Sequence, residues 1–544
     1  MRSGEQMTST PENTMHPTSP EWGRIKRALI ALLCALGAGL VAALSSITCM
    51  LILRLNAGIP TPVELFGDFV LKKLPANRFV AMLVFFSPNS KLAPLGLTAL
   101  AMLAIGTLLG PLYAALVRLR VPVTSHRPST REWLTMLSLG VILCLVGTIL
   151  FWTELRQNFL GLPIFWARLT SALGLLLDFV IYALVLGWCY RALLPKQPVA
   201  STSPTAQGRR ALLARTGVAI LGLGAAGGTL GLAREFKDEY AAYDGMKYYP
   251  PSGEITPPIT PNDAHYVVTQ NPIDPTPSLD VWRLEVTGLV GQSGTYTYEE
   301  FTSLPSISRA VTLECIANGI NDHFMSTAIW QGVTFRSLLA KHGGAHTSAR
   351  YVVFSSVDGY TVTQPLDEVL KTDALLAFRM NGAELPMRHG YPVRVLIPGH
   401  FGEENPKWVT RIELADEFVG GLYSDQGWYN GEVHTVSRID RPRGRVAFQP
   451  TLEIGGLAYS GIRGIQKVEI STDGGATWHN AQLTPPLSQD SWVFWSYQWQ
   501  PTTRGHYTLV ARATDGTGQV QTSVKQGTVP NGATGYAEIP VDLV

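Results

Sequence analysis

Long apolar stretches dominate the first 233 residues of this 544-residue chain, and short polar connections separate them. A helix needs about twenty predominantly apolar residues to cross a bilayer. Five stretches reach that length, at residues 28–53, 92–117, 132–152, 164–190 and 211–233. A further apolar run at 79–86 is too short to cross, so we expect it at the membrane interface. The pattern predicts a cytoplasmic tail (1–27) and an all-α membrane bundle of five helices (28–233).

Basic residues near the ends of these helices indicate an orientation, because lysine and arginine concentrate in cytoplasmic connections. Basic clusters precede the first helix and also join the second to the third and the fourth to the fifth. Loop 153–163 carries only Arg156, although segment 54–91 carries five basic residues against the trend. On balance, we expect a multi-pass protein of the cytoplasmic (inner) membrane with its C-terminal half outside the cytoplasm.

Three features of the membrane half bear on its role. The fifth stretch follows Arg209-Arg210 and is rich in glycine and alanine, which resembles an internal twin-arginine export signal; a basic membrane anchor is the alternative. Asp178 lies midway along the fourth stretch, where either a bond to a neighbouring helix or a proton or quinone site would explain it. The five stretches contain no histidine, so we expect no transmembrane b-type haem.

The pattern changes after residue 233. Residues 234–262 are polar and proline-rich, which predicts an extended linker. Residues 263–432 alternate short β-type runs with a few helices, which predicts an α+β domain, and Asn381-Gly382 predicts a tight hairpin turn. Residues 433–544 alternate strands and turns at the spacing of an all-β, immunoglobulin-like sandwich.

Composition and charge narrow the possible functions. The chain is 46% hydrophobic with a net charge of +2, and it has no basic stripe with interleaved aromatic residues, so nucleic acid is not an expected partner. Four of the five cysteines fall in the apolar stretches, leaving Cys315 alone in the polar half. A single cysteine cannot form a disulfide within its own domain, so that domain depends on its own core.

Three segments of residues 263–432 carry candidate chemistry. Cys315 ends a predicted strand before a glycine-containing loop, where a thiolate could bind a soft transition metal or be an inert core residue. His389 and Arg394 flank a tight turn suited to a phosphate, although a solvated surface pair would look the same. Lys407 follows a glycine-containing loop that could approach an anion.

Taken together, these segments resemble the sulfite oxidase family of molybdopterin-dependent oxidoreductases. The resemblance extends over about residues 263–526 and includes Trp282-Arg283-Leu284, Trp330-Gln331-Gly332-Val333, Asp358-Gly359-Tyr360, Met380-Asn381-Gly382 and Val468-Glu469-Ile470-Ser471. It implies a sulfite-oxidase-like domain that binds a molybdenum–molybdopterin cofactor (Moco). It also implies that the immunoglobulin-like domain is of the Moco-dimerisation type, so a homodimer is expected.

The resemblance also implies roles for individual residues. Cys315 matches the protein ligand to molybdenum, and Asp358 lies where pterin-contacting residues are found. Tyr429 lies near the family's active-site tyrosine, with a one-residue ambiguity against Trp428. The residues that match the grip on the pterin's phosphate end are His389, Arg394 and Lys407.

The chain departs from the family at two positions expected to carry arginines. After the cysteine it has Asn318-Gly319-Ile320-Asn321-Asp322, and before the first matched strand it has Thr269-Gln270-Asn271-Pro272. Without those guanidinium groups the site loses bidentate anion recognition, so sulfite is not the expected substrate. The polar side chains after the cysteine predict a more neutral pocket, suited to a small oxo-compound such as a sulfoxide. They are Asn318, Asn321, Asp322 and His323.

The sequence therefore predicts a membrane-anchored molybdenum oxidoreductase surrounded by membrane lipid. It would transfer an oxygen atom to or from a small oxo-compound, or reduce it, and exchange electrons with a quinone or an external carrier. Two alternatives belong to other classes: a cofactor-free binding or structural protein on the same fold, and a transporter or sensor whose five-helix bundle is the working part.

Overall fold

The computed structural model describes residues 20–86, 92–119, 121–125, 127–195, 197, 204–240, 254–271 and 273–544. The chain forms two compact units, and each unit combines segments that are distant in sequence. The first unit comprises Met1–Thr48, Leu100–Leu143 and Leu176–Thr229, and the second comprises Cys49–Ala99, Cys144–Leu175 and Leu230–Val544.

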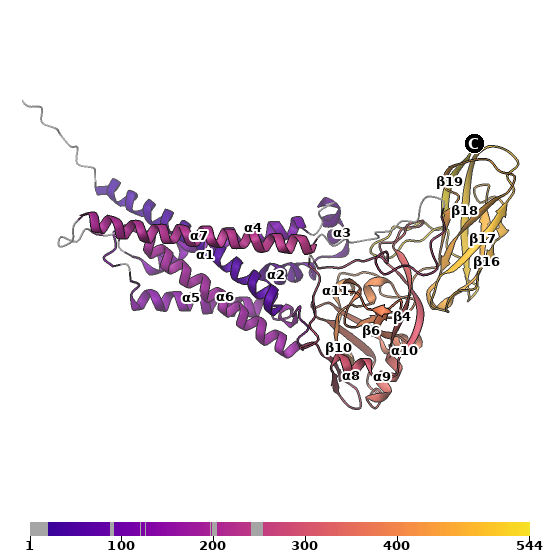
Figure 1. The fold of residues 1–544 in the computed structure, drawn as a ribbon, viewed down its shortest axis with the longest axis horizontal. Helices are drawn as coiled ribbons and strands as arrows, with labels where there is room; N and C mark the ends of the chain where they lie inside the picture. Colours follow the sequence, from indigo (N-terminus) through magenta and orange to yellow (C-terminus); the bar gives the residue numbers. More distant parts are fainter. Residues whose placement is uncertain are drawn as a thin grey trace, which may run out of the picture. The chain divides into compact units, whose positions relative to one another are not determined.

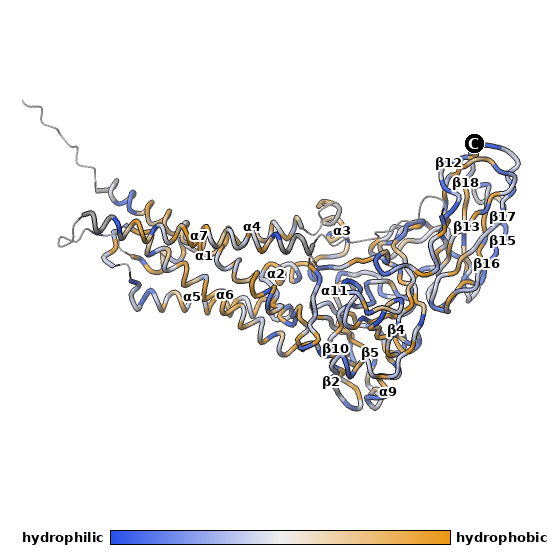
Figure 2. Tube along the Cα trace, viewed as in Figure 1, coloured by the Kyte–Doolittle hydropathy of each residue, from blue (hydrophilic) through white to orange (hydrophobic). Residues whose placement is uncertain are grey.

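Long helices account for most of the first 240 residues (Figure 1). They are α1 (Pro20–Ala57), α4 (Leu92–Val117), α5 (Thr130–Leu150), α6 (Ile164–Leu193) and α7 (Pro204–Tyr240). Within the described residues, these five helices are long and apolar enough to cross a membrane, by length and composition. Figure 2 shows predominantly hydrophobic positions along them. They coincide with the five apolar stretches, although α7 continues into the residues where a linker is predicted.

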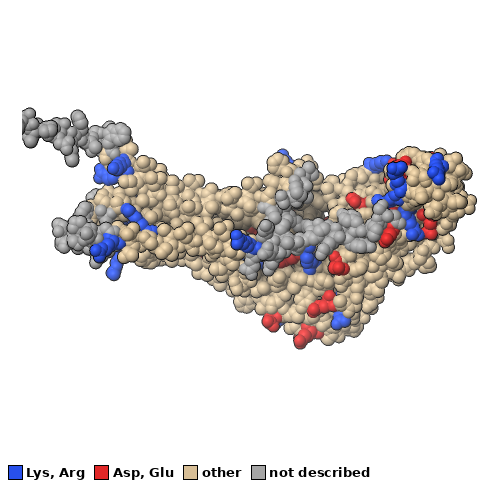
Figure 3. All heavy atoms as spheres, turned by 45° about the horizontal axis from the view of Figure 1, so that its top comes forward, with Lys and Arg blue, Asp and Glu red and all other residues tan. Residues whose placement is uncertain are grey.

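Small residues bring the helices of the first unit together. A Cβ on Gly110 of α4 would overlap the carbonyl oxygen of Ala35 in α1, so this contact requires glycine. The buried carboxylate of Asp178 in α6 accepts hydrogen bonds from Ser46 Oγ in α1 at 3.0 and 2.9 Å. These bonds join neighbouring helices, as one of the two interpretations of this acid predicts. In Figure 3, Lys and Arg side chains gather at the end of the helices where α7 begins.

Two short helices that the hydrophobic pattern does not predict follow α1 within the second unit. They are α2 (Pro62–Leu71) and α3 (Ala76–Phe85), and α3 covers most of the apolar run at 79–86. Thr61 and Glu64 form a capping box at the start of α2, because each side chain accepts the other's backbone N–H. Gln426 connects both helices to the C-terminal half: its Nε2 donates to the Leu71 carbonyl at 2.8 Å, and its carbonyl accepts from the Ala76 N–H at 3.1 Å.

Two β-sheets form the α+β region. The first has the order β2 (Gly294–Tyr296), β1 (Leu284–Gly288), β10 (Val409–Ala415), β5 (Tyr351–Ser356), β6 (Thr361–Pro365). The second has the order β3 (Ile307–Glu314), β4 (Met325–Thr334), β7 (Leu375–Met380), β8 (Ala383–Glu384), with β9 (Arg394–Leu396) also paired to β7. Short helices connect the strands, namely α8 (Tyr298–Thr302), α9 (Phe335–Lys341), α10 (Leu366–Lys371) and α11 (Leu422–Asp425).

Local geometry decides where two elements of this region turn or begin. Asn381 and Gly382 join β7 to β8 with φ of 51° and 78°, the positive values that a two-residue hairpin turn requires, so the predicted turn is confirmed. Strand β1 begins only at Leu284. The reason is local, because the Arg283 Nη1 donates to the carbonyl oxygens of Leu279 and Asp280 and stabilises a turn there.

Two further sheets form the C-terminal region. One has the order β11 (Val436–Arg441), β13 (Leu452–Tyr459), β17 (Val493–Trp499), β16 (Gln482–Leu483). The other has the order β12 (Gly444–Val446), β19 (Ala537–Leu543), β18 (Gly505–Asp515), β14 (Ile465–Ser471), β15 (His479–Asn480). Ile454 and Trp495 of the first sheet share one core with Leu509 and Ile539 of the second. The region is a two-layer β-sandwich, and its immunoglobulin-like type stays a prediction.

Residues 254–262 differ from the extended linker that composition predicts. Thr260 is 2% exposed and its N–H donates to the Thr327 carbonyl at 2.7 Å, while Thr256 Oγ1 accepts from Arg438 Nη2 at 2.6 Å. These contacts satisfy the polar groups of a proline-rich segment by packing it onto the two β regions. The earlier linker residues 241–253 lie outside the described part of the chain.

Candidate functional site

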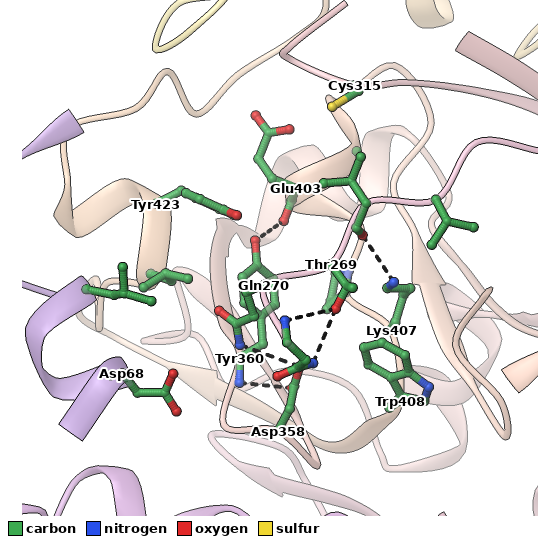
Figure 4. A pocket seen from close by; sticks show the side chains of 18 of the residues that line it. Asp68, Thr269, Gln270, Cys315, Asp358, Tyr360, Glu403, Lys407, Trp408 and Tyr423 are labelled. Carbon is green, nitrogen blue, oxygen red and sulfur yellow. Dashed lines mark hydrogen bonds between the residues drawn. The ribbon is translucent and has the colours of Figure 1, made fainter. Parts of the chain in front are cut away.

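A cavity of about 470 Å³ lies in the second unit, where segments far apart in sequence meet. Its lining includes residues 265–271, the loop after β3, the residues after β5, the turn before β9 and the loop before β10. Helices α2 and α3 and the first turns of α4 complete it. Figure 4 shows Asp68 of α2 on one side, Lys407 and Trp408 on the opposite side, and Cys315 on a third.

Cys315 follows β3 directly and lines the cavity. Strand β3 pairs with β4 along its whole length, up to Glu314 opposite Met325, and the Cys315 N–H continues the ladder to the Phe324 carbonyl at 2.9 Å. The side chain is 7% exposed. The sheet thus fixes the backbone of the cysteine at the edge of a cavity, as expected for a thiolate that ligates a metal.

A cationic wall, defined here as Arg388, His389, Arg394 and Lys407, lines another side of the cavity. Arg394 donates from Nη1 to the His389 carbonyl at 3.0 Å and from Nη2 to the Asn405 carbonyl at 3.3 Å. Lys407 Nζ donates to the carbonyl oxygens of Val268 and Arg388 at 3.1 and 3.2 Å. Backbone carbonyls therefore orient both cations.

A glycine allows the cationic wall to close up. Gly390 has a φ of 113°, and a Cβ on it would lie 2.9 Å from the Cβ of Arg394 and 3.0 Å from that of Lys407. Both the backbone conformation and the lack of space require glycine at this turn.

The protonation states of the cationic wall suit a phosphate. Burial, with a smaller contribution from the neighbouring Arg394 and Lys407, lowers the pKa of His389 to about 3. Burial also lowers the pKa of Arg394 to about 10. At neutral pH the histidine is therefore neutral and Arg394 is charged, and a guanidinium with fixed geometry is well suited to phosphate oxygens.

Asp358 is buried beside residues 269–271, and all of them line the cavity. Its carboxylate accepts hydrogen bonds from Asn271 Nδ2 at 2.6 Å and from the Tyr360 N–H at 3.2 Å. Burial raises the pKa of Asp358, and the Asn271 bond opposes that shift. Thr269, Gln270 and Asn271 thus stand where the family resemblance would place an arginine, and they present amides and a hydroxyl to the cavity.

Asn318 and Tyr429 do not belong to the cavity lining. Asn318 donates to Glu314 Oε1 at 2.9 Å and accepts from the Phe324 N–H at 3.0 Å, so it shapes the loop after Cys315. Tyr429 donates its hydroxyl proton to the Glu432 carbonyl at 3.0 Å, whereas its neighbour Trp428 does line the cavity. The catalytic roles of Asn318 and Tyr429 stay predictions.

The other polar residues after the cysteine point to the β-sandwich. Asn321 Nδ2 donates to the Glu538 carbonyl at 3.1 Å, and the Asp322 carbonyl accepts from Arg438 Nη1 at 3.1 Å. The His323 pKa is lowered to about 4, chiefly by burial. Residues 269–271, rather than these side chains, therefore give the cavity its neutral polar surface.

Sequence reasoning did not identify Glu403, which lines the cavity. Burial and the adjacent Glu404 raise the pKa of Glu403 well above its usual value. Its carbonyl accepts the Tyr360 hydroxyl proton at 2.5 Å. One sequence feature could have identified Glu403. Two consecutive glutamates follow a glycine directly in the predicted anion-binding loop.

Sequence reasoning also missed the side of the cavity formed by the short helices. We call it the apolar wall, defined by Val63, Phe66 and Val70 of α2, Phe79 and Met82 of α3, and Leu95 of α4. Asp68 of α2 lies within this wall.

The residues present fit a molybdopterin. Among the described residues, no group of three His, Cys, Asp or Glu side chains could bind a metal by itself, so a metal at Cys315 needs further ligands from an organic group. The cationic wall can bind the phosphate of such a group. Arg394 Nε and His265 Nε2 are buried without a hydrogen-bond partner among the described residues, and both residues line the cavity.

Comparisons with known proteins agree with this geometry. Residues 271–423 match the family model of the oxidoreductase molybdopterin binding domain, and residues 432–529 match that of the Mo-co oxidoreductase dimerisation domain. The chain is 28% identical over 304 residues to inducible nitrate reductase (NADH) 1 of Glycine max, covering 44% of this chain and 34% of the relative. It is 29% identical over 315 residues to mitochondrial sulfite oxidase of Mus musculus, covering 48% and 57%.

A solved structure is also similar. The sulfane dehydrogenase SoxCD from Paracoccus pantotrophus is 25% identical, with 52% of this chain and 77% of that chain covered and a TM-score of 0.44.

Together, the family models and the relatives support membership of the sulfite oxidase family for the C-terminal half of the chain. They confirm the predicted cofactor, because this domain and these relatives use the molybdenum cofactor. The chain spans only 34% of the nitrate reductase and 57% of the sulfite oxidase that it matches.

Proposed function

We propose that this chain is a membrane-anchored molybdopterin-dependent oxidoreductase that acts on a small oxo-compound by oxygen-atom transfer or reduction. The observation that carries the proposal is a single cavity lined both by Cys315 and by the cationic wall. Both lie within the segment that matches the molybdopterin binding domain. A cofactor-free binding protein would have no need for a buried arginine such as Arg394 beside a cavity, because burying a cation is costly.

In this proposal the chain's own residues position the cofactor. Cys315 ligates molybdenum, the cationic wall binds the phosphate end, and Asp358 contacts the pterin. When bound, the cofactor supplies a two-electron centre for oxygen-atom transfer. Arg394 and Lys407 already donate to backbone carbonyls, so little reorganisation is needed when the phosphate binds.

We propose a neutral oxo-compound such as a sulfoxide as substrate. Residues 269–271 offer amides and a hydroxyl instead of a guanidinium, and the burial that raises the pKa of Glu403 favours the neutral form of its carboxyl. Reduction of a sulfoxide consumes two electrons and two protons and releases a sulfide and water. Glu403 can supply one of these protons to the departing oxygen, and its carboxyl lies on the same side of the pocket as Cys315 in Figure 4.

We further propose that the five long helices lie in the cytoplasmic membrane, with the C-terminal half outside the cytoplasm. The basic residues at one end of the helices and the single Arg156 in loop 153–163 support this orientation. Arg209-Arg210 supports export by the twin-arginine route. The match to the dimerisation domain supports a homodimer, and electrons would be exchanged with a quinone or an external carrier.

Metal analysis and substrate comparison test the proposal. Full-length protein from a host that makes Moco should contain stoichiometric molybdenum and pterin. It should reduce dimethyl sulfoxide with a reduced viologen dye and oxidise sulfite far more slowly. Protein with no molybdenum and no pterin fluorescence would instead support the cofactor-free alternative, and fast sulfite oxidation would refute the proposed substrate class.

A further inference from the structure

The apolar wall connects the catalytic cavity to a membrane helix. Pro94, Leu95 and Thr98 line the cavity and belong to the first turns of α4, which is long and apolar enough to cross a membrane. Because α4 begins at the cavity, a molecule dissolved in the lipid could reach the apolar wall from the membrane interface. Water-soluble substrates gain little from such a surface.

One acid interrupts the apolar wall. Asp68 Oδ2 accepts a hydrogen bond from Gln157 Nε2 at 2.6 Å. Asp68 also lines a second cavity of about 160 Å³, whose polar lining includes Lys72, Arg156 and Asp425. The other acid of α2 that lines the larger cavity, Glu64, already pairs with Arg54 at 3.0 Å. Asp68 is therefore the acid that connects the apolar wall to a polar cavity.

Asp68 can exchange protons at neutral pH. Although its side chain is partly exposed to the two cavities, burial raises the pKa of Asp68 to about 7. The Gln157 bond and Lys72 oppose this shift, while Glu64 and Asp358 add to it. Arg156 and Asp425 also face the second cavity.

We propose that the apolar wall binds the ring of a membrane quinol, and that the Asp68 carboxylate accepts a proton from the quinol oxygen. The inference rests on the proposed function and identifies its electron donor. Quinol oxidation gives a quinone, two electrons for the molybdenum centre and two protons. Asp68 passes these protons one after the other to water in the second cavity. In the overall reaction, a quinol and a sulfoxide give a quinone, a sulfide and water.

A quinol fits these observations better than a carrier protein does. Its flat apolar ring matches the apolar wall, and its hydroxyl groups can reach a single acid. Within the described residues we find no metal-binding cluster of three His, Cys, Asp or Glu that could relay electrons from the surface. A donor that enters the cavity itself removes the need for such a relay.

Two glycines provide a matched pair for testing binding. Gly67 of α2 lines the cavity, Gly96 of α4 does not, and a Cβ on either would meet nothing within 4 Å. Gly67→Phe therefore has room for its Cβ and adds a ring at the cavity, and Gly96→Phe adds the same ring away from the cavity lining. The binding assay uses full-length protein in nanodiscs. Decyl-ubiquinone or a short-chain menaquinone that binds should quench the tryptophan fluorescence of the protein. We expect binding at least about tenfold weaker in Gly67→Phe and unchanged in Gly96→Phe.

A second variant tests the proton step. Asp68→Asn keeps the size of the side chain but cannot accept the proton. We expect it to bind decyl-ubiquinone within about twofold of the unsubstituted chain. Oxidation of decyl-ubiquinol should be slow and should lose its rise with pH around neutrality, because that rise reflects deprotonation of Asp68. A merely structural role would lower the rate at all pH values and leave the profile unchanged, which would refute the role of Asp68.

The outcomes separate this inference from the proposed function. Protein that contains molybdenum and reduces dimethyl sulfoxide with a viologen dye, yet binds no quinone probe, would overturn the inference alone. Equal weakening by Gly67→Phe and Gly96→Phe, or full displacement of the probe by a plain acyl chain, would indicate a lipid tail and also overturn it. Protein without molybdenum would refute the proposed function, while probe binding can still be measured.

Discussion

The cationic wall and the apolar wall face the same cavity but differ in origin and rigidity. The cationic wall comes from residues 388–407 and is oriented by backbone carbonyls, as the bonds from Arg394 and Lys407 show. The apolar wall comes from three helices in another part of the chain. The acid within it, Asp68, accepts a hydrogen bond from the side chain of Gln157 and not from the backbone. A charged cofactor needs fixed donors, whereas an apolar redox partner needs only a surface and a proton acceptor.

The largest effect is expected from Cys315→Ser. An alcohol is a poor ligand for a soft metal, so turnover should fall by about a thousandfold or more. The intact cationic wall should still bind the pterin, so pterin fluorescence should remain measurable. Cys144→Ser, in the buried part of α5, is the matched control and should change neither quantity. Full turnover in Cys315→Ser would refute metal ligation by this residue.

Arg394→Gln should have the next largest effect, and it acts on the cationic wall. The change removes donors to the His389 and Asn405 carbonyls and to the phosphate, at a cost of about 3 kcal/mol or more. Pterin content per chain, measured by fluorescence after extraction, should fall severely. Arg411→Gln is the control, because Arg411 of β10 pairs with Glu413 outside the cavity. Normal pterin content in Arg394→Gln would show that the cationic wall is not the phosphate site.

A smaller effect is expected from pH on the apolar wall. The pKa of Asp68 is raised from 3.8 to about 7, so the folded chain binds this proton more tightly than the unfolded chain does. Asp68 therefore lowers the free energy of unfolding as pH rises from about 4 to about 7. Asp68→Asn removes this pH-dependent loss of stability. The melting temperature of the variant minus that of the unsubstituted chain should therefore rise by roughly 2–4 °C between pH 4 and pH 8. Exposed Asp367→Asn should show no such trend.

For the cationic wall, the free energy of unfolding should change with pH in the opposite direction. His389 has its pKa lowered to about 3, so the unfolded chain takes up a proton that the folded chain does not. Stability should therefore fall as pH drops from about 6.5 towards 3, and His389→Gln should weaken this fall. Thermal unfolding over that pH range measures it, and an unchanged acid profile would contradict it.

The smallest effect is expected from Tyr429→Phe. The hydroxyl of Tyr429 bonds to the Glu432 carbonyl, so its removal should lower turnover by about twofold or less. A loss above about tenfold would show that Tyr429 enters the cavity during turnover, as its resemblance to the family's active-site tyrosine predicts. Trp428→Phe gives the comparison, because Trp428 does line the cavity.

Much of the cationic wall could be predicted because its residues are close in sequence. His389, Arg394 and Lys407 lie within one turn and one loop, so local spacing already brings them together. The apolar wall could not be predicted in this way. The bond from Gln157 to Asp68 joins positions 89 apart, and the bond from Gln426 to Leu71 joins positions 355 apart. A ten-residue helix such as α2 gives no pattern that identifies partners so distant.

The sequence alone determined the five long helices, because an apolar stretch of sufficient length satisfies its backbone polar groups within itself. It also determined Cys315 as the thiol at the end of β3. Only the tertiary structure decided which side chains share the cavity. It places Trp428 in the lining and not Tyr429, and residues 269–271 and not Asn318. It also adds Asp68, which the sequence did not indicate. The physical reason is that a cavity forms where distant segments pack, and packing against residues such as Phe79, whose ring lies 5.9 Å from that of Trp428, orients the side chains that line it.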